Sequence, residues 1–311
     1  MNHSPPLPPG LKRDFPLARL STIRVGGRAD LFARPQSEAE LIVLLAYARD
    51  LGVRVGVVGS GSNLLIADDG YRGLILKLDG GLAMIERDGE QLRCGGGARL
   101  PSAAAKAANW GLSGLEFGIN IPGTVGGAVR MNANAYGGEL AQSLASVRVC
   151  SADGVSERDP DQLGFGYRRS NLRDGEVVAS ALFDLSSGEV EAIKATLAAM
   201  REKRHEAQPS GIKTFGSTFK NPEGPRAEGR SAGQLLDAAG CRGLTVGGAR
   251  FSPKHANFVE NYADATSADV LALLAEGRRL VHEAFDVVLE PEVQVLGEVE
   301  WPQGWELGEG D

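Results

Sequence analysis

Hydrophobic and polar positions along this chain follow helical spacing in some stretches and form short apolar runs in others. Helical spacing predicts helices over residues 37–50, 102–109, 189–205, 231–239 and 266–285. Short apolar runs predict strands over residues 22–27, 53–58, 74–78, 83–87, 91–94, 177–185, 255–259 and 287–295. Ser37 and Thr266 each begin a capping box, and Asp88-Gly89 is a typical hairpin turn. The mixture indicates an α+β protein.

The apolar run 53–58 stops at a glycine-rich loop, Gly59-Ser60-Gly61, followed by Ser62 and Asn63. Glycines admit positive φ, so successive N–H groups in such a loop can converge on one anion. A phosphate or pyrophosphate site is one interpretation, and a tight loop after a strand is the other. The loop is not a G-x-G-x-x-G dinucleotide motif, because Leu64 stands at the third glycine position. It is not a P-loop either, since no Gly-Lys-Ser/Thr follows.

A second glycine-rich segment runs from Gly118 to Gly137. Long irregular stretches inside a compact domain are uncommon unless they bind something. Its backbone amides and small side chains could line a flat or extended ligand, and a structural Ω-loop is the alternative. Two such segments in one domain favour a bound nucleotide-type cofactor.

Composition and charge exclude several classes of binding partner. The chain has 311 residues, a net charge of −7 and a pI near 5.3, which argues against nucleic acid or an anionic membrane as a partner. The first ten residues lack the apolar core of a signal peptide, and no stretch reaches transmembrane length. The three cysteines are far apart and odd in number, so we expect reduced thiols in a cytoplasmic protein. The four histidines have no metal-ligand spacing, so no metal site is expected.

Six motifs then occur in a fixed order: VGSGSNLL (58–65), IPGTVGG…MNANAYG (121–137), FGYRRS (165–170), FGSTFKNP (215–222), GGARFSPKHANFVEN (247–261) and LEPEV (289–293). Together they resemble the UDP-N-acetylenolpyruvoylglucosamine reductases, flavoenzymes of peptidoglycan precursor synthesis. The resemblance covers roughly residues 14–297. No long insertion separates residues 177–185 from the following helix, so the chain resembles the loop-less type II members of the family.

The resemblance implies a fold and a domain division. Residues 14–188 would form a two-lobed FAD-binding domain of the vanillyl-alcohol-oxidase (PCMH) type, and residues 189–297 an α+β substrate-binding domain. We expect residues 1–13 to be a disordered N-terminal segment. Residues 298–311 form an acidic tail, to which the sequence assigns no function.

The resemblance also implies two sets of cofactor contacts. The FAD pyrophosphate would be held by Gly59, Ser60, Gly61, Ser62 and Asn63. The flavin side would be lined by Pro122, Gly123, Thr124, Gly126 and Gly127. Backbone N–H groups suit a dianionic pyrophosphate in an acidic protein, because they require no surplus of lysine.

Three catalytic residues follow from the same resemblance. Arg168 and Glu292 would stabilise the enolate or enol of the substrate, and Ser217 would be the general acid that protonates it. A planar, permanently charged guanidinium can stabilise developing carboxylate charge in a bidentate manner. A serine hydroxyl is a weak acid, so Ser217 requires polarising neighbours. Without the resemblance, Arg168-Arg169 would be interpreted as solvated side chains and Ser217 as a turn residue.

The candidate substrate contacts are Tyr167, Lys220, Asn221, Arg242 and Asn257. Arg242 stands where many relatives carry lysine, so a specific phosphate role for it stays open. Asn134 stands where relatives often carry glycine, and we expect the loop to tolerate it because asparagine adopts positive φ. His255 is interpreted as a hydrogen-bonded structural histidine.

The expected reaction is NADPH-dependent, FAD-mediated reduction of UDP-N-acetylglucosamine enolpyruvate to UDP-N-acetylmuramate. No nucleic acid or membrane partner is expected, and the oligomeric state is open, with a monomer favoured. One alternative is a flavin-dependent oxidase of the same cofactor-domain fold, in which Cys94 or Cys150 could tether the flavin. Another is a non-catalytic UDP-sugar or flavin-binding module.

Overall fold

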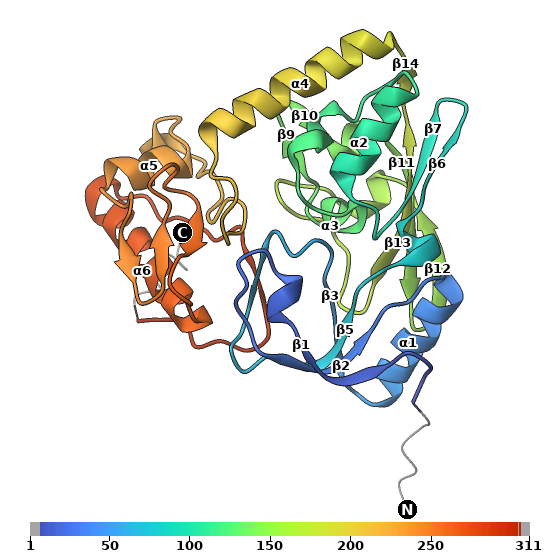
Figure 1. Cartoon of the computed structure of the whole chain (residues 1–311), viewed down its shortest axis with the longest axis horizontal. Coiled ribbons are helices and arrows are strands. Elements are labelled where there is room, and N and C mark those ends of the chain that lie inside the picture. Colours follow the sequence, from blue (N-terminus) through green and yellow to red (C-terminus); the bar gives the residue numbers. More distant parts are fainter. Residues whose placement is uncertain (1–6, 304, 306–311) are drawn as a thin grey trace, which may run out of the picture. The chain divides into compact units, whose positions relative to one another are not determined.

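The computed structural model describes residues 7–303 and residue 305 (Figure 1). Of the expected N-terminal segment 1–13, residues 1–6 lie outside the described residues, and strand β1 (Lys12–Pro16) begins within the remainder. The helices are α1 (Glu38–Asp50), α2 (Leu100–Asn109), α3 (Val125–Arg130), α4 (Val190–Ala207), α5 (Ala232–Ala238) and α6 (Ser267–Phe285). The capping box at Thr266 forms as predicted, since its side chain accepts from the N–H of Asp269 and the Asp269 carboxylate accepts from the N–H of Thr266. At Ser37 only half of the predicted box forms: its side chain accepts from the N–H of Glu40, but the Glu40 carboxylate accepts from the N–H of Gln36.

Two compact units make up the chain, and each is built from several segments. The first unit contains the described residues up to Phe15, residues Ala29–Ser60 and residues Arg72–Arg204. The second contains residues Pro16–Arg28, Gly61–Tyr71 and the described residues from His205 onward. The expected division at residue 188 concerns functional domains and stays a prediction.

The two largest sheets of the first unit each have their own hydrophobic core. One sheet has the order β1-β2-β5-β3, with β2 at Arg28–Ala33, β5 at Tyr71–Leu76 and β3 at Arg54–Val57. The other has the order β12-β11-β13-β7-β6, at Gly154–Arg158, Leu144–Ser151, Val177–Asp184, Gln91–Gly95 and Ile85–Asp88. Apolar residues of α1 pack into the core of the first sheet, and those of α2 and α3 into the core of the second. The expected two-lobed architecture is therefore confirmed (Figure 1).

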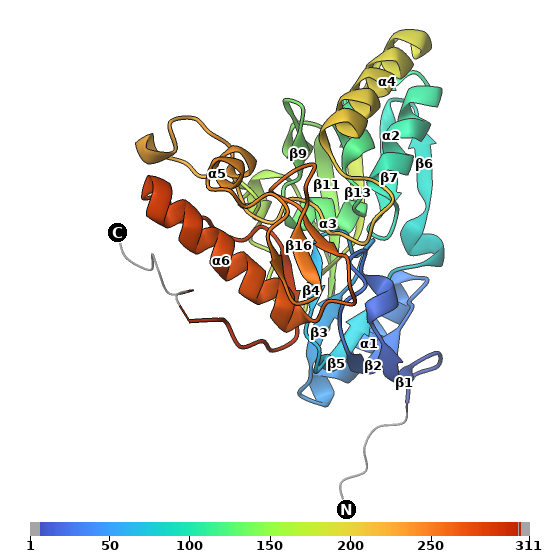
Figure 2. The same ribbon diagram turned by 60° about the vertical axis from the view of Figure 1, so that its left-hand side comes forward.

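The second unit is organised around a small sheet and two helices. Strands β15 (Thr245–Val246), β16 (Ala249–Phe251) and β17 (Val259–Asn261) form the sheet. Helix α6 packs beside β16 (Figure 2), and its inward residues Val270, Leu273, Leu274 and Val281 are buried as predicted. Strand β4 (Leu64–Ile66) pairs in parallel with β18 (Gln294–Leu296). The residues after the first glycine-rich loop therefore lie beside the residues that follow the LEPEV motif.

Some predicted elements were wrong. The stretch 118–137 is not wholly irregular, because it contains a 3-10 turn, Glu116–Asn120, and helix α3. Residues 255–258 form a turn before β17 rather than a strand, and residues 22–27 are irregular. Only the end of the run 287–295 belongs to a strand, β18. Pro291 lies in an isolated bridge with Phe219 and interrupts the run, because proline lacks the N–H that a continuous strand requires.

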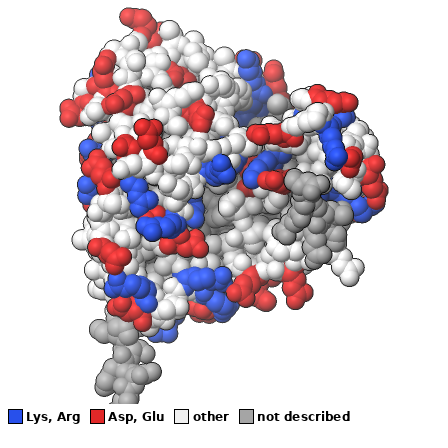
Figure 3. All heavy atoms as spheres, turned by 180° about the vertical axis from the view of Figure 1, so that it is seen from behind, with Lys and Arg blue, Asp and Glu red and all other residues white. Residues whose placement is uncertain are grey.

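Three features concern possible partners of the protein: its surface charge, its helices and its potential metal ligands. Lys and Arg side chains lie interspersed with Asp and Glu side chains on the face drawn in Figure 3. Among the described residues, no helix combines the length and apolarity needed to cross a bilayer. The same residues contain no cluster of three or more His, Cys, Asp or Glu side chains arranged to hold a metal ion.

Candidate cofactor and substrate site

The two glycine-rich segments meet in the first unit. A Cβ on Gly59 would lie 2.4 Å from Thr124 Oγ1, so only glycine allows the two segments to pack this closely. The half-buried Lys77, one residue after β5, donates a hydrogen bond from Nζ to the carbonyl of Gly59. Burial lowers the pKa of Lys77. The start of the predicted pyrophosphate loop is therefore fixed through its carbonyl oxygen.

Several N–H groups beside this contact are unused. Within the described part of the chain, the N–H groups of Gly59, Ser60, Thr124 and Gly127 make no hydrogen bond. By contrast, the N–H groups of Val125 and Gly126, at the start of α3, are bonded to carbonyls of residues 98 and 96. Unbonded N–H groups at a helix start suit a phosphate or a flavin carbonyl.

Gly127 supports a ligand on this side of α3. Its φ is not positive, and a Cβ would approach only Thr124 Oγ1, at 3.6 Å. Alanine would be the better helix former at this position, by about 1 kcal/mol. The glycine is explained if a flat group approaches the backbone closely, which is what a bound flavin requires. The residues therefore fit FAD.

In the second unit, residues 61–63 of the same loop also bond through their carbonyl oxygens. The donors are the N–H groups of Thr22 (3.0 Å), Gly216 (2.8 Å) and Gln294 (3.1 Å). The N–H groups of residues 61–63 have no acceptor among the described residues. Gly61 has φ +68°, where a residue with a Cβ would be strained. The loop thus keeps its donors available while its carbonyls hold its shape.

The same unit brings the segments of Ser217 and Glu292 together. The N–H of Glu292 donates to the carbonyl of Thr218 at 2.8 Å. Asn63 Nδ2 donates to the carbonyl of Glu292 at 3.0 Å. The N–H of Gly216, next to Ser217, is the donor to the loop carbonyl of Ser62. Three of the motifs predicted to form the site are therefore joined by hydrogen bonds.

Asn257 holds the Ser217 segment in place. Its side chain both accepts from the N–H of Phe219 and donates to the carbonyl of Phe219, at 2.9 Å each. Its own carbonyl accepts from the N–H of Thr218 at 2.9 Å. Asn257 is 4% exposed, so these contacts are a structural clasp. The ring of His255 accepts a hydrogen bond from the N–H of Asn257, which confirms the structural interpretation of that histidine.

Arg168 lies in the first unit, on a strained turn. Gly166 and Arg169 exchange backbone hydrogen bonds of 3.1 and 3.2 Å, so Tyr167 and Arg168 are the two central residues of the turn. Arg168 has φ +57°, a conformation that glycine or asparagine normally supplies at the second central position. The guanidinium carbon lies 4.9 Å from the centre of the Tyr167 ring, and Nη1 donates to Asn134 Oδ1 at 2.8 Å.

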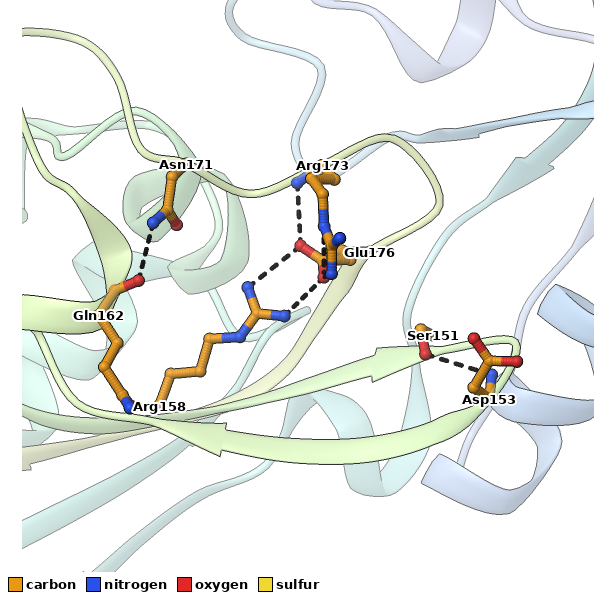
Figure 4. A network of polar contacts seen from close by, with 7 residues as sticks. All are labelled: Ser151, Asp153, Arg158, Gln162, Asn171, Arg173 and Glu176. Carbon is orange, nitrogen blue, oxygen red and sulfur yellow. Dashed lines mark hydrogen bonds and ion pairs between the residues drawn. The ribbon is translucent and has the colours of Figure 1, made fainter.

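Glu176 secures the connection that carries this turn. Its carboxylate accepts two hydrogen bonds from Arg158, at the end of β12, and further ones from the N–H and side chain of Arg173 (Figure 4). The Glu176 side chain is 6% exposed. Hydrogen bonds from Arg158 lower the pKa of Glu176 to about 2 despite its burial. Both ends of the connection bearing Arg168 are thus fastened to one buried charge.

The remaining candidate substrate residues have partners within their own unit. Lys220 Nζ forms an ion pair with the exposed carboxylate of Glu290 at 2.9 Å. Asn221 Oδ1 accepts from the N–H of residue 232 at the start of α5. The guanidinium of Arg242 bonds to the carboxylate of Asp237 and to the carbonyls of residues 253 and 254. A substrate role for each stays a prediction.

Sequence reasoning missed Lys77 and Glu176. Lys77 lies inside the apolar run 74–78, and a charged residue within such a run was the available signal. Glu176 directly precedes the apolar run 177–185. Neither signal predicts which residue the side chain contacts, because Lys77 and Glu176 each bond to a residue in another segment of the sequence. The segment accommodates Asn134 as expected but not through a positive φ, because Asn134 lies in the short strand β9 (Asn134–Ala135).

Comparison with known proteins places this architecture in a class and then in a family. Residues 29–158 match the family described as FAD binding domain, so the first unit contains the cofactor-binding fold of a flavoprotein. Residues 208–296 match the C-terminal domain of UDP-N-acetylenolpyruvoylglucosamine reductase. The chain belongs to the family of UDP-N-acetylenolpyruvoylglucosamine reductases, which are FAD-dependent oxidoreductases.

Individual relatives cover nearly the whole chain. A UDP-N-acetylenolpyruvoylglucosamine reductase of Anaeromyxobacter sp. (strain Fw109-5) is 42% identical over 92% of this chain and 88% of that protein. UDP-N-acetylenolpyruvoylglucosamine reductase 2 of Symbiobacterium thermophilum is 40% identical over 94% of each. The crystal structure of the Thermus caldophilus reductase superposes with a TM-score of 0.79 and 36% identity, covering 94% of this chain and 99% of that one.

Proposed function

We propose that this chain reduces UDP-N-acetylglucosamine enolpyruvate to UDP-N-acetylmuramate, a cytoplasmic step of peptidoglycan precursor synthesis, with NADPH as the reductant. Family membership supports the reaction, since the relatives carry the name of that reductase. One observation carries the assignment of residues. The loop at Asn63, the segment of Ser217 and the segment of Glu292 are hydrogen bonded to one another.

The cofactor would be held chiefly by backbone donors. The N–H groups of residues 59–63 would bind the FAD pyrophosphate, and Thr124 with the glycines around it would face the flavin. Pro122 has no N–H, and the N–H of Gly126 is bonded to Gly96, so these two would contribute contact rather than hydrogen bonds. Lys77 adds a positive charge beside the loop, which favours a dianion.

The reaction saturates one carbon–carbon double bond. The bound flavin, once reduced by NADPH, would supply a hydride to the terminal vinyl carbon. Arg168 would bind the substrate carboxylate, onto which negative charge moves as the double bond is attacked. A planar guanidinium can bind both carboxylate oxygens, so it stabilises the enolate, in which more negative charge lies on those oxygens, more than the ground-state carboxylate.

Ser217 and Glu292 would complete the reduction. The Ser217 hydroxyl would donate its proton to the carbon next to the carboxylate, and Glu292 would stabilise the enol form. The donor must lie at a fixed place relative to that carbon, which a rigid backbone provides. The clasp of Asn257 on Phe219 and the bond of Glu292 to Thr218 supply that rigidity. Tyr167, Lys220, Asn221 and Arg242 are proposed as contacts to the rest of the substrate.

The test separates reduction of the enzyme from reduction of the substrate. The yellow protein is reduced anaerobically with NADPH until its flavin absorbance is bleached, and the enolpyruvyl nucleotide is then added. We expect the absorbance to return and one equivalent of UDP-N-acetylmuramate to form for each flavin. UDP-N-acetylglucosamine, which lacks the enolpyruvyl group, is the control and leaves the flavin bleached. If the enolpyruvyl nucleotide also leaves the flavin bleached, the proposed function is wrong.

A further inference from the structure

The turn that carries Arg168 is attached to residues 130–134 at three points in the first unit. Ser170 Oγ donates to the carbonyl of Arg130 at 2.9 Å. Asn132 Nδ2 donates to the carbonyl of Gly166 at 3.3 Å. Arg168 Nη1 donates to Asn134 Oδ1 at 2.8 Å. The first two contacts hold the turn, and of the three only the last reaches the guanidinium itself.

We propose that Asn134 is a positioning residue for Arg168, which sets the direction of the guanidinium toward the substrate carboxylate. This inference rests on the proposed role of Arg168. Asn134 is held in turn by the ladder between β9 and β10 (Gly138–Glu139), where it pairs with Glu139. The ring of Tyr167 lies against the guanidinium, 4.9 Å from its central carbon, and restricts it further.

The chemistry of the amide suits this task. An amide oxygen is uncharged, so it can accept one N–H of the guanidinium without itself neutralising the positive charge. A carboxylate at the same position would form an ion pair and compete with the substrate carboxylate. The guanidinium has five N–H donors, and the bond to Asn134 uses only one of them.

The test compares Asn134→Ala with a matched control in the same region. Asn171 donates from Nδ2 to the carbonyl of Gln162 at 2.8 Å, so Asn171→Ala also removes one side-chain hydrogen bond of an asparagine, but one that does not involve Arg168. We expect Asn134→Ala to slow flavin reoxidation by the enolpyruvyl nucleotide about tenfold, the size of one charge-assisted hydrogen bond. Reduction by NADPH, the melting temperature and the affinity for the enolpyruvyl nucleotide stay near wild type. Asn171→Ala leaves the reoxidation rate unchanged.

A second background shows whether Asn134 acts through Arg168. In the Arg168→Ala protein, adding Asn134→Ala changes the reoxidation rate less than about twofold, since the group to be positioned is gone. An equal loss in both backgrounds, or a single variant within about twofold of wild type, overturns the proposal. A merely structural role would give the same loss in both backgrounds.

Chemical labelling tests the contact without any turnover. Phenylglyoxal modifies free guanidinium groups, and peptide mass spectrometry locates the modified arginine. Asn134→Ala makes labelling of Arg168 several times faster, and Asn171→Ala does not. Unchanged labelling overturns the proposal. The labelling result is independent of the proposed function. If Asn134→Ala speeds the labelling of Arg168 but the wild-type protein does not act on the enolpyruvyl nucleotide, the contact with Asn134 is established and the proposed function is wrong.

Discussion

The N–H of Glu292 donates a hydrogen bond to the carbonyl of Thr218 at 2.8 Å, and this bond sets the register between two distant segments. One segment carries the proposed proton donor, and the other carries the proposed carboxylate. Phe219 and Pro291 form a bridge in the same pair of segments, so the register is fixed at two points. A fixed register holds reacting groups in one geometry, which is how binding energy is converted into rate.

Removing the ammonium of Lys77 should weaken cofactor binding. Lys77→Met loses both the bond to the Gly59 carbonyl and a positive charge beside the proposed pyrophosphate site. We expect the dissociation constant of FAD, measured by fluorescence titration of the apoprotein, to rise about tenfold or more. Lys106→Met, which removes an exposed lysine on α2, serves as the control.

The pH dependence of that affinity provides a second check on Lys77. Burial lowers the pKa of Lys77 in the free protein, and a bound anion would raise it. The affinity of the wild-type protein for FAD should therefore fall at alkaline pH, as Lys77 loses its proton. The Lys77→Met protein should have a flatter profile. If the pH profiles of FAD affinity are parallel for the two proteins, the charge of Lys77 does not contribute to FAD binding.

Glu176 should contribute to stability in a pH-dependent way. Its folded-state pKa of about 2 lies below the ordinary value of 4.5, so its contribution is present above pH 4.5 and is lost as pH falls toward 2. The shift corresponds to roughly 3 kcal/mol. Denaturant titrations should find Glu176→Gln less stable than wild type at neutral pH, with the gap narrowing in acid. A gap independent of pH would show that the carboxylate charge is not what stabilises the Arg158 contact.

The three cysteines should be unreactive in the folded protein. Burial raises the pKa of Cys94 to about 12 and that of Cys150 and Cys241 to about 11. Because the thiolate is the reactive form, a thiol reagent should label none of them at neutral pH and all three after unfolding. Acid precipitation should leave the yellow colour in the supernatant. Colour retained in the pellet would instead favour the flavin oxidase alternative with a cysteine-tethered cofactor.

Local signals in the sequence predicted local structure well. The helix caps at Ser37 and Thr266 depend only on neighbouring residues, and both side chains cap their helices as predicted. Helix α3 was missed because Gly126 and Gly127 have low helix propensity, while its start is stabilised by contacts to residues 96 and 98.

The long-range contacts of the site had no comparable signal. The clasp of Asn257 on Phe219 joins residues 38 positions apart, and the ends of the Glu176 network belong to separate elements. A side chain's type indicates that it needs a partner, but which partner it finds depends on the tertiary fold. The motifs therefore predicted candidate residues, and only the structure assigned contacts such as that of Asn134 with Arg168.

The most direct measurement is a single turnover by Ser217→Ala, started with the flavin already reduced by NADPH. Ser210→Ala, an exposed serine on the same approach, is the control. We expect Ser217→Ala to bind FAD and to be reduced by NADPH at the wild-type rate, yet to form UDP-N-acetylmuramate about a thousandfold more slowly, as loss of a general acid does. Product formation by Ser217→Ala at a rate close to that of Ser210→Ala would contradict this expectation.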